Sequence, residues 1–262
     1  MPTGSSVSAP AAWRDRMPAW TALGAVVAAS WLYLAWMQIG IVDAICRGAA
    51  AMGHVGLDDL FWAFLMWTVM MVATMLPTAV PATLLFTALS ERRSSKAKAG
   101  SLEIFYVAGY LAAWMAYSTP AALAQWSLLR LQMLSPMAMS ANRILSVAVL
   151  VAAGLFQFSS LKEACLSKCR TPLAFFLAEW RDGAHGAFVV GLRHGGYCVA
   201  CCWALMAVMF VVGTMNVVWM GILTIFVLGE KLAPRSWRVS QASGVVLLAW
   251  AAWVGFGALL PN

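Results

Sequence analysis

Residues 60–89 read LFWAFLMWTVMMVATMLPTAVPATLLFTAL and contain no charged side chain. A helix that crosses the hydrocarbon core of a bilayer needs about 20 consecutive apolar residues, and this run is long enough. Pro77 and Pro81 interrupt the run, but membrane helices tolerate proline as a kink. The stretch therefore predicts a transmembrane helix.

Similar apolar runs repeat along the chain on both sides of this stretch. They predict an all-α integral membrane protein of about seven transmembrane helices, with spans near residues 19–41, 60–89, 103–128, 143–160, 187–212, 215–230 and 240–259. We expect residues 1–18 to form a flexible tail and residues 19–260 to form a single polytopic membrane domain.

The composition of the whole chain favours the same class of protein. Of its 262 residues, 63% are hydrophobic and only 10% are charged, whereas a soluble domain carries about 25% charged residues. So few charges cannot cover the surface of a soluble globule of this size. The net charge of +7 then indicates membrane topology rather than a nucleic-acid partner.

The lysine and arginine residues predict the orientation of the chain in the membrane. With the N-terminus inside, thirteen of them fall in inside segments and three in outside segments, which is a strong positive-inside bias. Within the inside segment 161–186, Pro172 followed by apolar and aromatic residues predicts a short interfacial helix before the fifth span.

Cysteines gather around the start of the fifth span. Cys165 and Cys169 are four residues apart, and on an ideal helix His194, Cys198, Cys201 and Cys202 fall within an arc of about 100°. Thiolates select Cu(I), and thiolates with imidazole also suit zinc. This pattern predicts a soft-metal site at the inner side of the fifth span, built from Cys165, Cys169, His194, Cys198, Cys201 and Cys202.

Other readings of the same residues remain open. Cysteines also serve as small apolar side chains at helix contacts. Cys198 and Cys201 have the spacing of a dithiol oxidoreductase. A further alternative is an accessory structural subunit of a larger membrane complex, in which the cysteines are structural. Met66, Met70, Met71, Met75, Met215 and Met220 suit either ordinary packing or a path for Cu(I).

Two further residues beside the cysteines have simpler interpretations. His185 is expected to be solvated, and Arg193 to pair with Glu179 or Asp182. The sequence contains no Walker, Rossmann or serine-hydrolase motif, and an enzymatic activity is not predicted.

The stretches CLSKCRTP (165–172), GLRHGGYCVACCWALM (191–206), GTMNVVWM (213–220) and GEKLAP (229–234) resemble a bacterial family of predicted metal-binding integral membrane proteins, sometimes labelled copper chaperones. The resemblance covers about residues 60–255, and Ala200 stands where we would expect another glycine. It implies the same six ligand candidates, copper as Cu(I) or else zinc, and a multi-pass location in the bacterial inner membrane. The partners it implies are the lipid bilayer and either a membrane cuproenzyme or other membrane subunits.

Overall fold

The computed structural model describes residues 17–39, 56–135, 140–214 and 216–256, and within these ranges the secondary structure is helical, with a single isolated bridge between Leu134 and Ala141. The elements are α2 (Met17–Ile39), α4 (Leu57–Arg93), α5 (Lys96–Arg130), α6 (Arg143–Phe156), α7 (Ser160–Arg170), α8 (Pro172–Glu179), α9 (Gly183–Ala207), α10 (Met209–Val212), α11 (Val217–Leu232), a 3₁₀ turn η1 (Arg235–Trp237) and α12 (Val239–Phe256).

The predicted all-α class is confirmed, and each of the seven expected spans overlaps a helix. Three of these helices or helix pairs are long and apolar enough to cross a membrane: α4, α9 together with α10, and α12; counting the bent pair α6–α7 as one span gives four. This is fewer than the seven expected. Part of the difference arises because α6 has 14 residues and α11 has 16, each shorter than a complete span requires.

Local capping explains where several helices begin. The side chains of Asn142, Ser159 and Asn216 accept hydrogen bonds from the backbone N–H groups of Leu145, Lys162 and Trp219, at the starts of α6, α7 and α11. These contacts satisfy donors that have no partner inside the helix. Gly213 separates α10 from α11 with φ of 98°, a left-handed conformation that glycine adopts without steric cost.

Helix α4 continues through Pro77 and Pro81. Because Pro77 has no N–H group, the carbonyl of Ala73 loses its usual partner within the helix. The indole Nε1 of Trp31 in α2 donates to this carbonyl at 3.0 Å. The contact ties α2 to α4 at the point where the proline leaves an acceptor unpaired.

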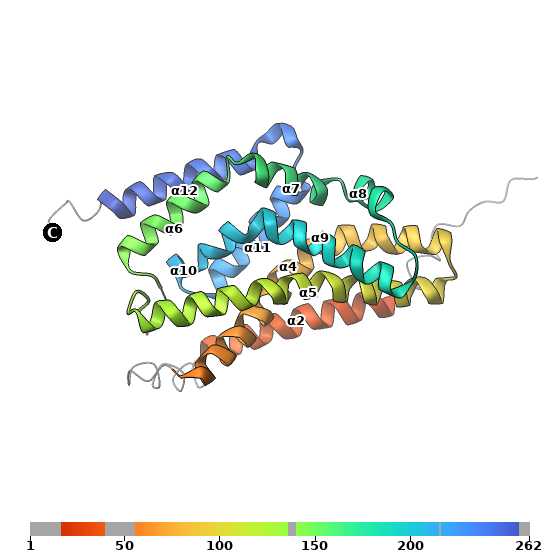
Figure 1. Cartoon of the computed structure of the whole chain (residues 1–262), viewed down its shortest axis with the longest axis horizontal. Helices are drawn as coiled ribbons and strands as arrows, with labels where there is room; N and C mark the ends of the chain where they lie inside the picture. The colour runs from red at the N-terminus through yellow and green to blue at the C-terminus, as the bar shows by residue number, and fades with distance from the viewer. Residues whose placement is uncertain (1–16, 40–55, 136–139, 215, 257–262) are drawn as a thin grey trace, which may run out of the picture.

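Helices α4, α5 and α9 form the centre of the molecule, with α5 packed on both of the others (Figure 1). Gly191 and Gly195 permit the close approach of α9 to α5, since a Cβ atom at Gly191 would overlap the carbonyl oxygen of Tyr106. Small residues four positions apart are the usual means by which membrane helices approach closely.

A buried ion pair connects α7 to α11. Lys162 Nζ lies 2.8 and 2.9 Å from the two carboxylate oxygens of Glu230, and both side chains are almost fully buried. Arg170 Nε donates to the backbone oxygen of Glu230 at 2.8 Å. These contacts hold α7 against the bundle, where it also packs on α9.

Candidate metal centre

Helix α9 is continuous through the adjacent glycines Gly195 and Gly196. The helical register places Cys198, Cys201 and Cys202 on the buried side of α9, and each is at most 1% exposed. The shared face predicted from the spacing is therefore present as one turn of buried thiols.

Helix α7 brings a fourth thiol to the same place. The Cys169 side chain interacts with those of Cys198 and Cys201, and the Sγ atoms of Cys201 and Cys202 are 3.3 Å apart. All of these cysteines are free thiols. Cys165 is also buried, but it lies one turn before Cys169 on α7.

Two polar side chains approach Cys198 from other helices. Lys231 Nζ at the end of α11 lies 3.1 Å from Cys198 Sγ and 2.6 Å from Thr78 Oγ1. Tyr110 Oη of α5 lies 3.2 Å from Cys198 Sγ and donates to the Met75 carbonyl at 3.2 Å. A buried ammonium group beside a sulfur complements negative charge on that sulfur.

Sequence reasoning did not associate Lys231 or Tyr110 with the site. In the sequence, Lys231 is one of the thirteen positive charges of the inside segments, and Tyr110 is one of the tyrosines within the expected span 103–128. The one available signal was the pair of opposite charges, Glu230 and Lys231, at the end of an apolar run.

His194 lies in a box of aromatic rings next to the thiols. Its Nδ1 atom is 2.6 Å from Tyr106 Oη, and its ring packs against those of Tyr110, Phe175 and Phe176. The hydrogen bond to Tyr106 occupies one of the two ring nitrogens. The structure therefore gives His194 a packing and hydrogen-bonding role, and a ligand role for its other nitrogen stays a prediction.

The remaining predicted residues lie away from the thiols. Arg193 forms an ion pair with Glu179, one of the two partners expected for it, and His185 is exposed. Cys46 lies outside the described residues.

Within the described ranges, no group of three or more His, Cys, Asp or Glu side chains is arranged to hold a metal ion. The four clustered thiols from α7 and α9 instead form a compact set of side-chain contacts, supported by Lys231 and Tyr110. Thiols in such a cluster can bind a soft cation after side-chain rotation, or can form a disulfide when they are oxidised.

The fold and the centre define an all-helical protein with apolar helices and a buried cluster of free thiols. The chain belongs to the PpoB2 family, described as copper chaperone, whose family model matches residues 64–254. This match confirms the resemblance seen in the sequence and associates the chain with copper. Comparison with curated proteins and with solved structures gives no match.

Proposed function

We propose that this protein binds Cu(I) as its cargo, within a membrane, through the buried thiols of Cys169, Cys198, Cys201 and Cys202. The observation that carries the proposal is the convergence of these four free thiols from two helices. Thiolates are the ligands that Cu(I) prefers. Cys165 and His194 are the other candidates from the sequence. Each lies four residues from one of these thiols along its helix, and we propose that they take part in transferring Cu(I) to or from the four thiols.

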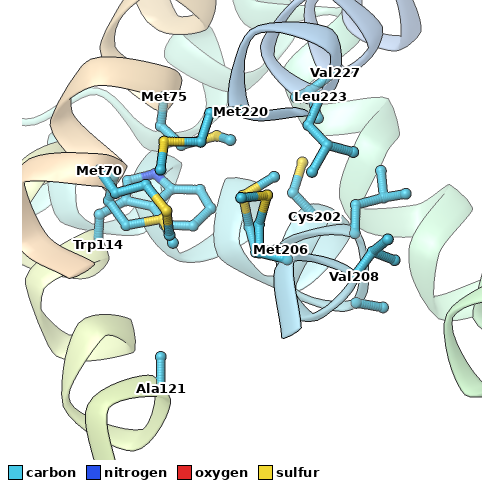
Figure 2. Packing of buried hydrophobic residues seen from close by; sticks show 14 of the residues in the cluster. Met70, Met75, Trp114, Ala121, Cys202, Met206, Val208, Met220, Leu223 and Val227 are labelled. Atoms are coloured by element: carbon cyan, nitrogen blue, oxygen red, sulfur yellow. The ribbon is translucent and has the colours of Figure 1, made fainter. Parts of the chain in front are cut away.

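The surrounding methionines favour copper over zinc. Met70, Met75, Met206 and Met220 belong to the same buried cluster as Cys202 and converge with it between α4, α9 and α11 (Figure 2). Thioethers bind Cu(I) but are poor ligands for zinc, which takes sulfur, nitrogen and carboxylate oxygen donors. A thiol centre that is continuous with thioethers therefore suits Cu(I).

Two methionines extend this sulfur-rich region beyond the thiols. Met206 follows Cys202 by four residues on α9, and Met209 begins α10; each is at most 2% exposed. In the seven-span arrangement with the N-terminus inside, this direction leads from the inner side of the membrane toward the outer side. We infer that the protein delivers Cu(I) to a membrane cuproenzyme or passes it across the bilayer of the bacterial inner membrane.

The positions of the cysteines favour copper binding over a thiol-disulfide oxidoreductase function. Cys198 lies in the interior of α9, which begins at Gly183. Reactive dithiols of such enzymes usually lie at a helix N-terminus, where the helix dipole favours the thiolate. Cys198 and Cys201 lack this arrangement.

The test is copper binding by detergent-purified, anaerobic protein, measured by competition with a chromogenic Cu(I) chelator. We expect about one equivalent of copper in the wild type and its loss in the Cys198→Ser/Cys201→Ser double variant. Cys46→Ser is the control, because it removes a thiol that the topology places on the other side of the membrane.

Two outcomes contradict the proposal. One is a wild-type protein that competes for no copper, and the other is a double variant that binds as the wild type does. A reducible disulfide between Cys198 and Cys201, found without copper binding, would assign the oxidoreductase function instead.

A further inference from the structure

A polar pocket lies where the bend between α6 and α7 meets the start of α12. The two helices of the bend meet at 65°, and α12 runs along α6 (Figure 1). The cavity measures about 320 Å³, which is within the size range of small-molecule sites. Nothing in the copper function uses it.

Buried polar groups without partners line this pocket. The side-chain nitrogen and oxygen of Gln157, together with Ser240 Oγ, have no hydrogen-bond partner. Gln157 is 4% exposed and Ser240 is 7% exposed. Because buried polar groups in folded proteins are nearly always hydrogen-bonded, these atoms indicate a polar occupant.

The charges on the pocket wall favour an anion. Arg170 and Arg238 both line the cavity, with Glu163 as the opposing charge. The Nε contact to Glu230 fixes the Arg170 guanidinium, whose Nη1 atom is 3.8 Å from Glu163. An arginine pair beside glutamine and serine donors matches the oxygen atoms of a phosphate.

The backbone at Arg238 supports the same conclusion. Arg238 has a φ of 47°, a left-handed conformation that non-glycine residues rarely adopt. Such conformations gather at binding sites, where the surrounding structure maintains them. The residue also precedes the first turn of α12, so the positive end of the helix dipole faces the pocket.

We propose that this pocket binds a phosphate ester, supplied by the headgroup of a phospholipid. The exposed apolar residues next to it favour a lipid over a soluble ester: Phe158, Leu161 and Trp237 are 48%, 60% and 70% exposed. Phe158 lines the cavity itself. Glu163 on the same wall has the charge that complements an amine on the headgroup.

The experiment measures the unfolding temperature of delipidated full-length protein during titration. The probes are short-chain phosphatidylethanolamine, free phosphoethanolamine, and a short-chain diacylglycerol that has no phosphate. We expect saturable stabilisation by the phospholipid and none by the diacylglycerol. Stabilisation by phosphoethanolamine at comparable concentration would identify the soluble ester as the source of the same chemistry.

Variants separate loss of the site from loss of the fold. Arg238→Gln removes a cation, and Gln157→Glu adds an anion of nearly the same shape. In both we expect the apparent affinity to fall by about tenfold or more, the effect of losing a charge-assisted hydrogen bond. The exposed Arg92→Gln change at the end of α4 is the control and should bind as the wild type does.

Gln157→Glu keeps the test decisive, because its carboxylate can pair with the nearby arginines and maintain the fold without ligand. The proposal is overturned if no probe stabilises the wild type. It is also overturned if the diacylglycerol acts as well as the phospholipid, or if both pocket variants respond as Arg92→Gln does.

Discussion

Side chains from four helices meet at the sulfur atom of Cys198. Its thiol faces Lys231 from α11 and Tyr110 from α5, while Cys169 approaches from α7 and Cys198 itself belongs to α9. Each of these partners is at most 8% exposed. A sulfur held by buried donors is protected from water, and a soft cation that replaces these donors would enter a dry site.

Substitution of His194 tests whether this side chain serves packing or binds the metal. We expect His194→Phe to destabilise the protein by about 1–3 kcal/mol, because Tyr106 Oη loses its buried partner. Unfolding in mixed micelles measures this change. The double variant His194→Phe/Tyr106→Phe should recover part of the loss.

Copper binding by the same variant decides the role of the imidazole. We expect the stoichiometry of the His194→Phe protein to match that of the wild type. A drop in Cu(I) affinity of about tenfold or more would instead assign His194 the ligand role predicted from the sequence.

At the scale of the elements, the contact between α5 and α9 positions the thiol centre. A Cβ atom at Gly195 would lie 2.7 Å from both the Tyr110 carbonyl oxygen and the Ala113 Cβ, whereas a Cβ atom at Gly196 would meet nothing within 4 Å. The two adjacent glycines therefore form a matched pair on one helix.

We expect Gly195→Ala to destabilise the protein by about 1–3 kcal/mol, because the added methyl group forces backbones apart. Gly196→Ala should be neutral or should stabilise by up to about 1 kcal/mol, as alanine has the higher helix propensity. Unfolding of both variants in mixed micelles checks the difference. Equal effects would show that the close contact does not limit stability.

At the scale of the whole molecule, the positive charges predict an orientation in a membrane. The connection between α4 and α5 lies between Arg93 and Lys96, in a segment that the charge bias places inside. A reporter fused at residue 97 should therefore be active only as a cytoplasmic reporter. Activity of a periplasmic reporter at this position would overturn the N-in topology and place the thiols toward the outer side.

Much of the fold was predictable because its signals are local. Apolar runs located the helices, and Pro172 correctly marked the start of α8. Helix α7 was missed, since LKEACLSKCR is polar and reads as a loop. Its helical state depends on the Ser159 cap and on the buried Lys162–Glu230 ion pair, whose partners are 68 residues apart.

The sequence by itself determined which face of α9 carries the thiols, because helical periodicity needs only the residues of that helix. It also determined the family, through a long local motif. The sequence also placed Cys165 and Cys169 in one site with Cys198, but only the tertiary structure decided that Cys169 is the one in contact with it. Only the tertiary structure decided that Lys231 and Tyr110 meet Cys198, and that Tyr106 hydrogen-bonds to His194. These contacts join residues 29 to 88 positions apart, and such pairings arise from how the helices pack rather than from any local pattern.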